Sequence, residues 1–182
     1  SMDKTITAKG DRYVELRHNN SPVGVNSCLS GTVIRVSTLN PQGFGGLLSK
    51  QKNAKEFDKF LATENPHVIG LNETQIPSGR SRRLGHTSRY YTLLVKHAVS
   101  KGYVAFTSHH NSGRATHGVT VLVKECMQVI RVQRGLDEGH DEQWEGRVLA
   151  VYTAGMCFLS VYMPHTTADR DLLRDQMRAF II

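Results

Sequence analysis

Two short apolar segments with an amphipathic segment between them constrain the fold of this chain more than any other feature. The first covers residues 33–39 and the second residues 67–72, and both have the length and β-branched content of buried strands. The segment between them repeats apolar residues three and four positions apart, as one side of a helix does: Leu47, Ala54, Phe57, Phe60 and Leu61. Asn65-Pro66 then provides a helix-stop signal. Strand, helix and strand in this order predict a βαβ unit, in which a right-handed crossover makes the two strands parallel.

A polar residue follows each of these strands directly. Asn40 comes after the first strand and Glu73 after the second. Because parallel strands place their carboxyl ends on one rim of a sheet, where open α/β folds bind ligands, we expect Asn40 and Glu73 to lie side by side. An acid paired with an amide suits a hard cation, whereas an isolated glutamate after a strand is more simply read as a surface acid.

The rest of the chain alternates short β runs with turns and closes with a helix. The β runs are predicted at residues 90–95, 103–107, 119–124, 127–132, 147–152 and 156–162. The closing helix covers residues 169–182, with Leu173, Met177 and Phe180 on one side. Residues 1–30 are polar and rich in turn residues, so we treat them as a lead-in to one folded unit from residue 31 to residue 182.

The charge of the chain indicates what kind of partner it binds, and its cysteines indicate the cellular compartment. Lysine and arginine outnumber aspartate and glutamate by 23 to 16, and the formal net charge of +7 favours nucleic acid over a membrane surface, although many soluble proteins are this basic. The chain begins without the apolar stretch of a signal peptide, and no window approaches the ~18 apolar residues of a membrane span. Cys28, Cys126 and Cys157 have neither disulfide-framework nor zinc-ribbon spacing. We therefore expect an intracellular protein, of the nucleus or the cytoplasm, with reduced cysteines and no membrane partner.

Five motifs along the chain match one known family in their order. They are Thr38-Leu39-Asn40-Pro41-Gln42-Gly43, Leu71-Asn72-Glu73-Thr74-Gln75-Ile76, Gly118 to Val123, Glu145-Gly146-Arg147 and Val161-Tyr162-Met163-Pro164-His165. On these motifs the chain resembles the endonuclease/exonuclease/phosphatase superfamily, in the branch of apurinic endonucleases and non-LTR retrotransposon endonucleases. The resemblance covers about residues 32 to 182. It implies an α/β fold in which two sheets pack face to face with helices outside, a four-layer α/β sandwich.

The same resemblance implies that this chain supplies the N-terminal half of such a sandwich. With one sheet per half, the inner face of a mixed sheet with flanking helices would be exposed, and large apolar faces seldom stay exposed. We therefore expect a partner that buries this face: a second copy in a homodimer, the C-terminal half, or another complementing chain.

The resemblance also assigns roles to the rim residues. Glu73 would be the ligand of Mg²⁺, with Mn²⁺ as the alternative ion, and Asn40 would orient that carboxylate or a metal-bound water. Tyr162 and His165 would hydrogen-bond the scissile phosphate. Arg147 and Asn72 would support the site.

Basic and histidine-rich loops add candidate ligand contacts. Arg80, Arg82, Arg83 and Arg114 are expected to touch the phosphate backbone of DNA, or of RNA, with a solvated loop as the alternative. His109, His110 and His117 suggest zinc, but no cysteine is near enough in sequence to complete a familiar site.

Departures from the family pattern limit the predicted activity. His165 and Asn72 stand where the family usually has Asn and Gln, and the Gly-Asp-x-Asn segment that carries the catalytic base is not in the sequence. The first prediction is the N-terminal half of a Mg²⁺-dependent DNA endonuclease that binds metal weakly and cleaves slowly or not at all. The alternatives are a non-catalytic nucleic-acid-binding or interaction module that keeps the fold, and a phosphatase of the same superfamily.

Overall fold

The structure, a computed structural model, describes residues 34–43, 47–48, 50–76, 89–109, 117–136 and 143–181. The predicted lead-in, residues 1–30, lies outside this part of the chain. The described helices and strands follow in the order β1 (Val36–Leu39), α2 (Gln51–Glu64), β2 (Val68–Asn72), α3 (Arg89–Ser100), β3 (Tyr103–Ser108), β4 (Val119–Lys124), β5 (Val129–Arg134), β6 (Val148–Thr153), β7 (Met156–Val161) and α4 (Thr167–Ile181).

The first sheet contains the predicted βαβ unit. Its strand order is β1-β2-β4-β3, with β1 parallel to β2 in a register that pairs Val36 with Val68, while β4 runs antiparallel to both β2 and β3. The helix between β1 and β2 ends as predicted, because Asn65 takes the left-handed conformation at φ 45° and donates its N–H to the carbonyl of Leu61. The parallel arrangement expected from the sequence is confirmed.

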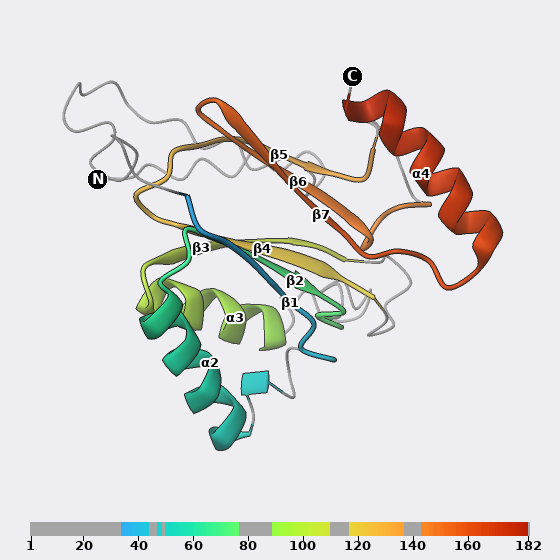
Figure 1. The fold of residues 1–182 in the computed structure, drawn as a ribbon. Coiled ribbons are helices and arrows are strands. Elements are labelled where there is room, and N and C mark those ends of the chain that lie inside the picture. The colour runs from blue at the N-terminus through green and yellow to red at the C-terminus, as the bar shows by residue number, and fades with distance from the viewer. Residues whose placement is uncertain are drawn as a thin grey trace.

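Alternation along the strands divides this sheet into two apolar faces. Residues such as Ile69, Leu71 and Leu122 pack against α2 and α3 through Phe57 and Leu94. Asp58 of α2 also links the two helices, since one of its oxygens pairs with Lys101 just after α3 at 3.0 Å and the other lies 3.0 Å from His97 of α3, whose pKa is lowered chiefly by burial. Figure 1 shows α2 and α3 together on this side of the sheet.

The opposite face of the first sheet packs against a second sheet. This sheet is antiparallel, with the order β5-β6-β7, and Figure 1 shows it lying over β1–β4. Val119, Val121 and Val123 of β4 share one buried cluster with Leu149 and Val151 of β6. The β-branched pattern of β4 therefore reflects burial between the two sheets on one face and under helices on the other.

The last helix covers the outer side of the second sheet and completes a four-layer arrangement. The Thr166 hydroxyl caps the N-terminus of this helix, because it accepts from the Asp169 N–H at 3.2 Å, and it donates to the Asp169 carboxylate at 2.6 Å. Leu173 is fully buried with Trp144 and Val148. The layers are thus helices, sheet, sheet and helix, as the predicted α/β fold class requires (Figure 1).

The expected exposure of the inner sheet face is wrong. That expectation gives one sheet to each half of the family fold, but β5, β6 and β7 of this chain already form a second sheet on that face. Because the valines of β4 are buried within the chain, their burial gives no reason for a homodimer or a complementing chain. An exposed inner face was the reason to expect such a partner, and this face is buried.

The expected strand at residues 90–95 is also wrong, because this segment belongs to α3. Its tyrosines, Thr92 and Val95 favour a strand by intrinsic preference. In the structure, Leu94 and Ala98 are buried four positions apart and Tyr91 packs beside them, which is the spacing of a helical face. Packing against the sheet decides the conformation over local preference.

Two further expectations concern cysteines and membranes. Cys126 is disulfide-bonded and Cys157 is free, so the expected full set of reduced cysteines is wrong at Cys126. Within the described ranges, no helix has the length and apolar character needed to cross a bilayer.

The neighbouring leucines of α4 provide a matched test of how this helix docks. Leu173 is fully buried, whereas the side chain of Leu172 is 42% exposed. We expect Leu173→Ala to lower the free energy of unfolding by about 2–5 kcal/mol, because it removes packing and leaves a cavity beside Trp144. Leu172→Ala should change it by less than about 1 kcal/mol. Urea denaturation of both variants measures the difference, and equal losses would contradict the docking of α4 through Leu173.

Candidate active site

The parallel pairing of β1 with β2 brings Asn40 and Glu73 together, as the sequence predicted. The Asn40 Nδ2 donates to Oε2 of Glu73 at 2.9 Å. The N–H of Gln42 donates to Oδ1 of Asn40 at 3.0 Å, which fixes the amide with its nitrogen toward the carboxylate. Asn40 is thus oriented by a hydrogen bond from the backbone two residues later, which is an Asx turn.

Tyr162 of the second sheet reaches the other oxygen of the same carboxylate. Its hydroxyl donates to Oε1 of Glu73, so both oxygens of Glu73 accept a hydrogen bond from the protein. These bonds, first that of Tyr162 and then that of Asn40, lower the pKa of Glu73 despite partial burial. The carboxylate is therefore ionised at neutral pH.

The Tyr162 hydroxyl also links Glu73 to His165. The Nε2 atom of His165 lies 3.2 Å from this hydroxyl. Because the hydroxyl has one proton and donates it to Glu73, His165 must donate here and carries hydrogen on Nε2. Burial and the Glu73 carboxylate raise the pKa of Tyr162, so the hydroxyl stays protonated at neutral pH.

Arg147 lies over the ring of Tyr162, and His117 lies beside both. The guanidinium carbon of Arg147 is 5.4 Å from the ring centroid of Tyr162. The Nη2 atom of Arg147 is 3.1 Å from Nε2 of His117, and the His117 and Tyr162 ring centroids are 5.6 Å apart. Residues after the ends of β1, β2 and β7 and before the starts of β4 and β6 thus converge on one polar cluster: Asn40, Glu73, His117, Arg147, Tyr162 and His165.

His117 is the member of the cluster that the sequence did not reveal. Its grouping with His109 and His110 suggested only a weak zinc pattern, and His110 lies outside the described residues. In the part of the chain that is described, no three histidine, cysteine, aspartate or glutamate side chains are grouped to hold a metal ion. The signal in the sequence was its position just before Gly118. Only the register that pairs Val119 with Asn72 shows that this position lies near Glu73.

The side chain of Asn72 contacts the second sheet. It accepts a hydrogen bond at 3.2 Å from the hydroxyl of Ser160 on β7. This bond joins β2 to β7 one residue before Glu73. The bond helps to place the two strands that lead to Glu73 and Tyr162, while the expected supporting role of Asn72 stays a prediction.

The loops of the site are held in left-handed backbone conformations. Gln42, Glu73, Gln75 and His117 have φ angles of 49°, 52°, 48° and 60°. Such residues cost about 1–3 kcal/mol each and persist where surrounding contacts fix them. Here the N–H of Gly43 donates to the carbonyl of Glu73 at 2.9 Å, and the N–H of Gln75 donates to that of His117 at 2.7 Å. These bonds fix the loops that carry the polar cluster.

Gly118 is required at the centre of these loops. Its φ of 92° is unfavourable for residues with a side chain, and a Cβ atom would lie 2.7 Å from the Oγ1 of Thr74. Its N–H donates to the carbonyl of Gly146 at 2.9 Å, and its carbonyl accepts from Thr74 at 3.0 Å. Gly118 therefore ties the Glu73 loop to the Arg147 loop.

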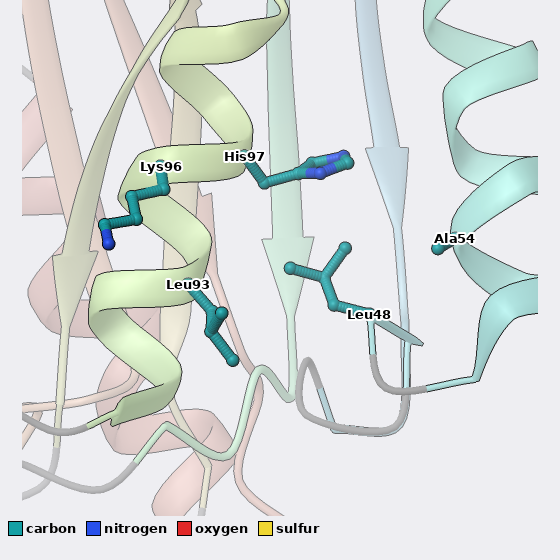
Figure 2. Close-up of a pocket in the computed structure, with 5 residues that line it drawn as sticks. All are labelled: Leu48, Ala54, Leu93, Lys96 and His97. Atoms are coloured by element: carbon teal, nitrogen blue, oxygen red, sulfur yellow. The ribbon is translucent and has the colours of Figure 1, made fainter.

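The predicted nucleic-acid contacts Arg80, Arg82, Arg83 and Arg114 fall outside the described residues. A cavity of about 350 Å³ lies between α2 and α3 and is lined by Leu48, Ala54, Leu93, Lys96 and His97. Figure 2 shows Leu48 and His97 directed toward the space between the helices, with the ammonium of Lys96 pointing away from it. This cavity is on the helical side of the first sheet, away from the strand ends that carry Glu73.

Comparison with known proteins identifies the fold. No protein-family model matches the sequence, and no curated protein is significantly similar to it. The structure is similar to that of the 3′ phosphatase NExo from Neisseria bound to a product DNA hairpin, with 13% sequence identity and a TM-score of 0.56 over 82% of this chain and 51% of that chain. The chain has the fold of this phosphatase. The predicted α/β fold class is thereby confirmed.

A second solved structure is the catalytic domain of APE2 from Xenopus laevis. It is 16% identical in sequence, with a TM-score of 0.47 over 81% of this chain and 50% of that chain. The chain thus spans about half the length of each of these two structures.

A buried histidine near this rim makes stability depend on pH. His109 follows β3, and burial together with the charge of Arg134 lowers its pKa to about 4. The unfolded chain takes up this proton near pH 6.5, so the free energy of unfolding should fall as the pH drops from about 6.5 to about 4, by at most about 3 kcal/mol. Above this window His109 is neutral in both states and contributes no pH dependence.

Urea denaturation of the wild type and of His109→Gln at several pH values in this window isolates the effect of His109. Other titrating groups are common to both proteins, so their contributions cancel in the comparison. The variant should lose less stability on acidification than the wild type. Parallel profiles would show that His109 is not protected from protonation.

Proposed function

We propose that this chain carries the metal-binding part of a Mg²⁺-dependent phosphoester hydrolase that acts on DNA. The observation that carries the proposal is the carboxylate of Glu73, which is ionised and oriented by a hydrogen bond to each of its oxygens. An aromatic hydroxyl, an arginine and a histidine surround it, which are groups that bind phosphate oxygens. The five sequence motifs support the apurinic or retrotransposon type of endonuclease.

The donor set around Glu73 fits magnesium. Mg²⁺ binds one or two carboxylates and completes its shell with waters and substrate phosphate oxygens, so a single acid at a strand end suits it. Asn40 and Tyr162 each occupy one lone pair of the carboxylate, which leaves others for an ion. Mn²⁺ prefers the same oxygen ligands. A bound ion would supply Lewis-acid neutralisation of phosphate charge.

The neighbouring side chains would bind and orient the phosphate group. Arg147 brings a positive charge over the face of Tyr162, and His165 presents its Nε2 hydrogen at the Tyr162 hydroxyl. Donors placed in this way stabilise charge on phosphoryl oxygens. Asn40 would keep the Glu73 carboxylate in one orientation while the phosphate is bound. No base is assigned to this set, so we expect slow or absent turnover by this chain alone.

DNA is the proposed substrate, and the ester attacked separates two candidate reactions. The net charge of +7 supports a nucleic-acid ligand. The Neisseria protein that shares the fold is a 3′ phosphatase bound to a product DNA hairpin, which favours a terminal phosphate as the second candidate substrate besides an internal phosphodiester. Hairpins with a 3′ phosphate or an internal abasic site distinguish the two reactions. Binding to both hairpins without hydrolysis of either would favour the non-catalytic module.

Removal of the Glu73 charge tests the metal site. We expect Glu73→Gln to weaken Mn²⁺ binding by at least about tenfold, because the amide keeps the shape and loses the charge that binds the ion. Electron paramagnetic resonance of free Mn²⁺ measures the affinity, and competition with Mg²⁺ gives the value for magnesium. The control is Glu64→Gln at the exposed end of α2, which should leave the affinity unchanged. If Glu73→Gln bound Mn²⁺ as the wild type does, the proposed metal site would be wrong.

Paired arginine substitutions test the DNA contacts proposed for the arginine-rich segment after β2. Replacement of Arg80 and Arg82 by Gln should weaken binding to a DNA hairpin and reduce the slope of log K against log salt by about 1 for each phosphate that the chain no longer neutralises. Replacement of Arg174 and Arg178 by Gln changes the net charge equally, but these arginines pair with Asp171 and Asp175 on α4. Fluorescence anisotropy at several salt concentrations measures both slopes. Equal slopes for the two double variants would refute a specific role of the loop.

A further inference from the structure

The backbone holds His117 between the two loops that carry the charged groups of the site. Its carbonyl accepts from Gln75 at 2.7 Å on the Glu73 side, and the next residue, Gly118, donates to Gly146 at 2.9 Å on the Arg147 side. Its φ of 60° is a conformation that glycine adopts without a side-chain penalty. The backbone therefore does not require an imidazole at this position.

The hydrogen bond between His117 and Arg147 fixes the tautomer of the imidazole. The guanidinium of Arg147 has only donors, so Nε2 of His117 must accept at their separation of 3.1 Å. The imidazole in this contact is then neutral and has its hydrogen on Nδ1. His165, on the other side of Tyr162, instead carries hydrogen on Nε2.

A neutral acceptor leaves the positive charge of Arg147 available to an anion. The hydrogen bonds that fix its guanidinium go to His117 Nε2 and, at 3.5 Å, to the carbonyl of Tyr162. Burial lowers the pKa of Arg147, while Tyr162 and Asp169 oppose that shift. The carboxylate of Glu73 already accepts from Asn40 and Tyr162. Arg147 is thus oriented without a direct ion pair to the acid that would bind the metal.

We propose that His117 is a positioning residue, which holds the guanidinium of Arg147 over Tyr162 so that it can bind a phosphate group of a DNA substrate. This inference rests on the proposed function. The Nε2 of His117 provides the acceptor, and its ring packs beside Tyr162 and limits sideways movement of the guanidinium. Without this acceptor, Arg147 would sample orientations that do not bind phosphate, and ordering it would weaken binding.

A double-mutant cycle on the full chain tests this role. The readout is the affinity for a fluorescent DNA hairpin with a 3′ phosphate, measured by anisotropy. We expect His117→Leu, which removes the acceptor, to weaken binding about threefold to tenfold, and His117→Gln, which retains one, to rescue most of the loss. In an Arg147→Gln background, His117→Leu should have no further effect, because the two residues act through one contact.

The tautomer of His117 provides a second readout, which is measured on the wild-type protein. In two-dimensional NMR spectra that correlate ring nitrogens with ring hydrogens, wild-type His117 should show an unprotonated Nε2 and a protonated Nδ1, whereas His165 should show a protonated Nε2. Hydrogen on Nε2 of His117 would overturn the inference, since Arg147 would then have no acceptor there. Arg147→Gln supplies the assignment, because it should shift the His117 resonances.

The outcomes separate the inference from the function on which it rests. A wild type that binds no hairpin would overturn the proposed function and this inference together. A wild type that binds, with His117→Leu equal to it or with equal losses in both backgrounds, would overturn the inference alone. Melting temperatures of all variants show whether a loss of binding reflects a loss of fold.

Discussion

The packing of the two sheets through their apolar faces is the interaction on which the candidate site depends. Glu73 comes from the first sheet, and Tyr162 follows the last strand of the second, so their contact exists only because β4 and β6 bury their side chains against each other. Burial of this kind contributes about 25 cal/mol per Å² and has no direction of its own. Hydrogen bonds are directional, and those at the strand ends fix how the strands of the two sheets lie relative to each other. One of them joins Ser160 to Asn72.

Much of the first sheet could be predicted because its signals are local. The strand ends at Asn40 and Glu73 and the stop at Asn65 lie within one βαβ unit, whose handedness and parallel order follow from general rules. The strand prediction for residues 90–95 is wrong because these residues prefer strands by themselves, and burial of Leu94 under the sheet is not visible in the sequence. Sheet packing and the place of His117 depend on long-range register, which residue patterns do not encode directly.

The strained loops make the site rigid in advance of any ligand. Left-handed conformations at Glu73, Gln75 and His117 store an energetic cost that the folded sheets must offset, and the cross-loop hydrogen bonds keep that cost from being relieved by local movement. A site that is ordered before binding does not lose further freedom when the substrate arrives. The same bonds explain why one glycine, Gly118, is required where the three loops meet.

The Tyr162 hydroxyl, shared between Glu73 and His165, has a thermodynamic consequence. If a phosphate binds there as proposed, an oxygen that accepts the Tyr162 proton would withdraw it from Glu73, and the carboxylate would then offer a cation a stronger pair of electrons. A cation on Glu73 would in turn compete for that electron pair and release the hydroxyl toward phosphate. Linkage would make the two effects equal in free energy, so each ligand would raise the affinity for the other by the same factor. A single proton position would thereby couple the two proposed binding events.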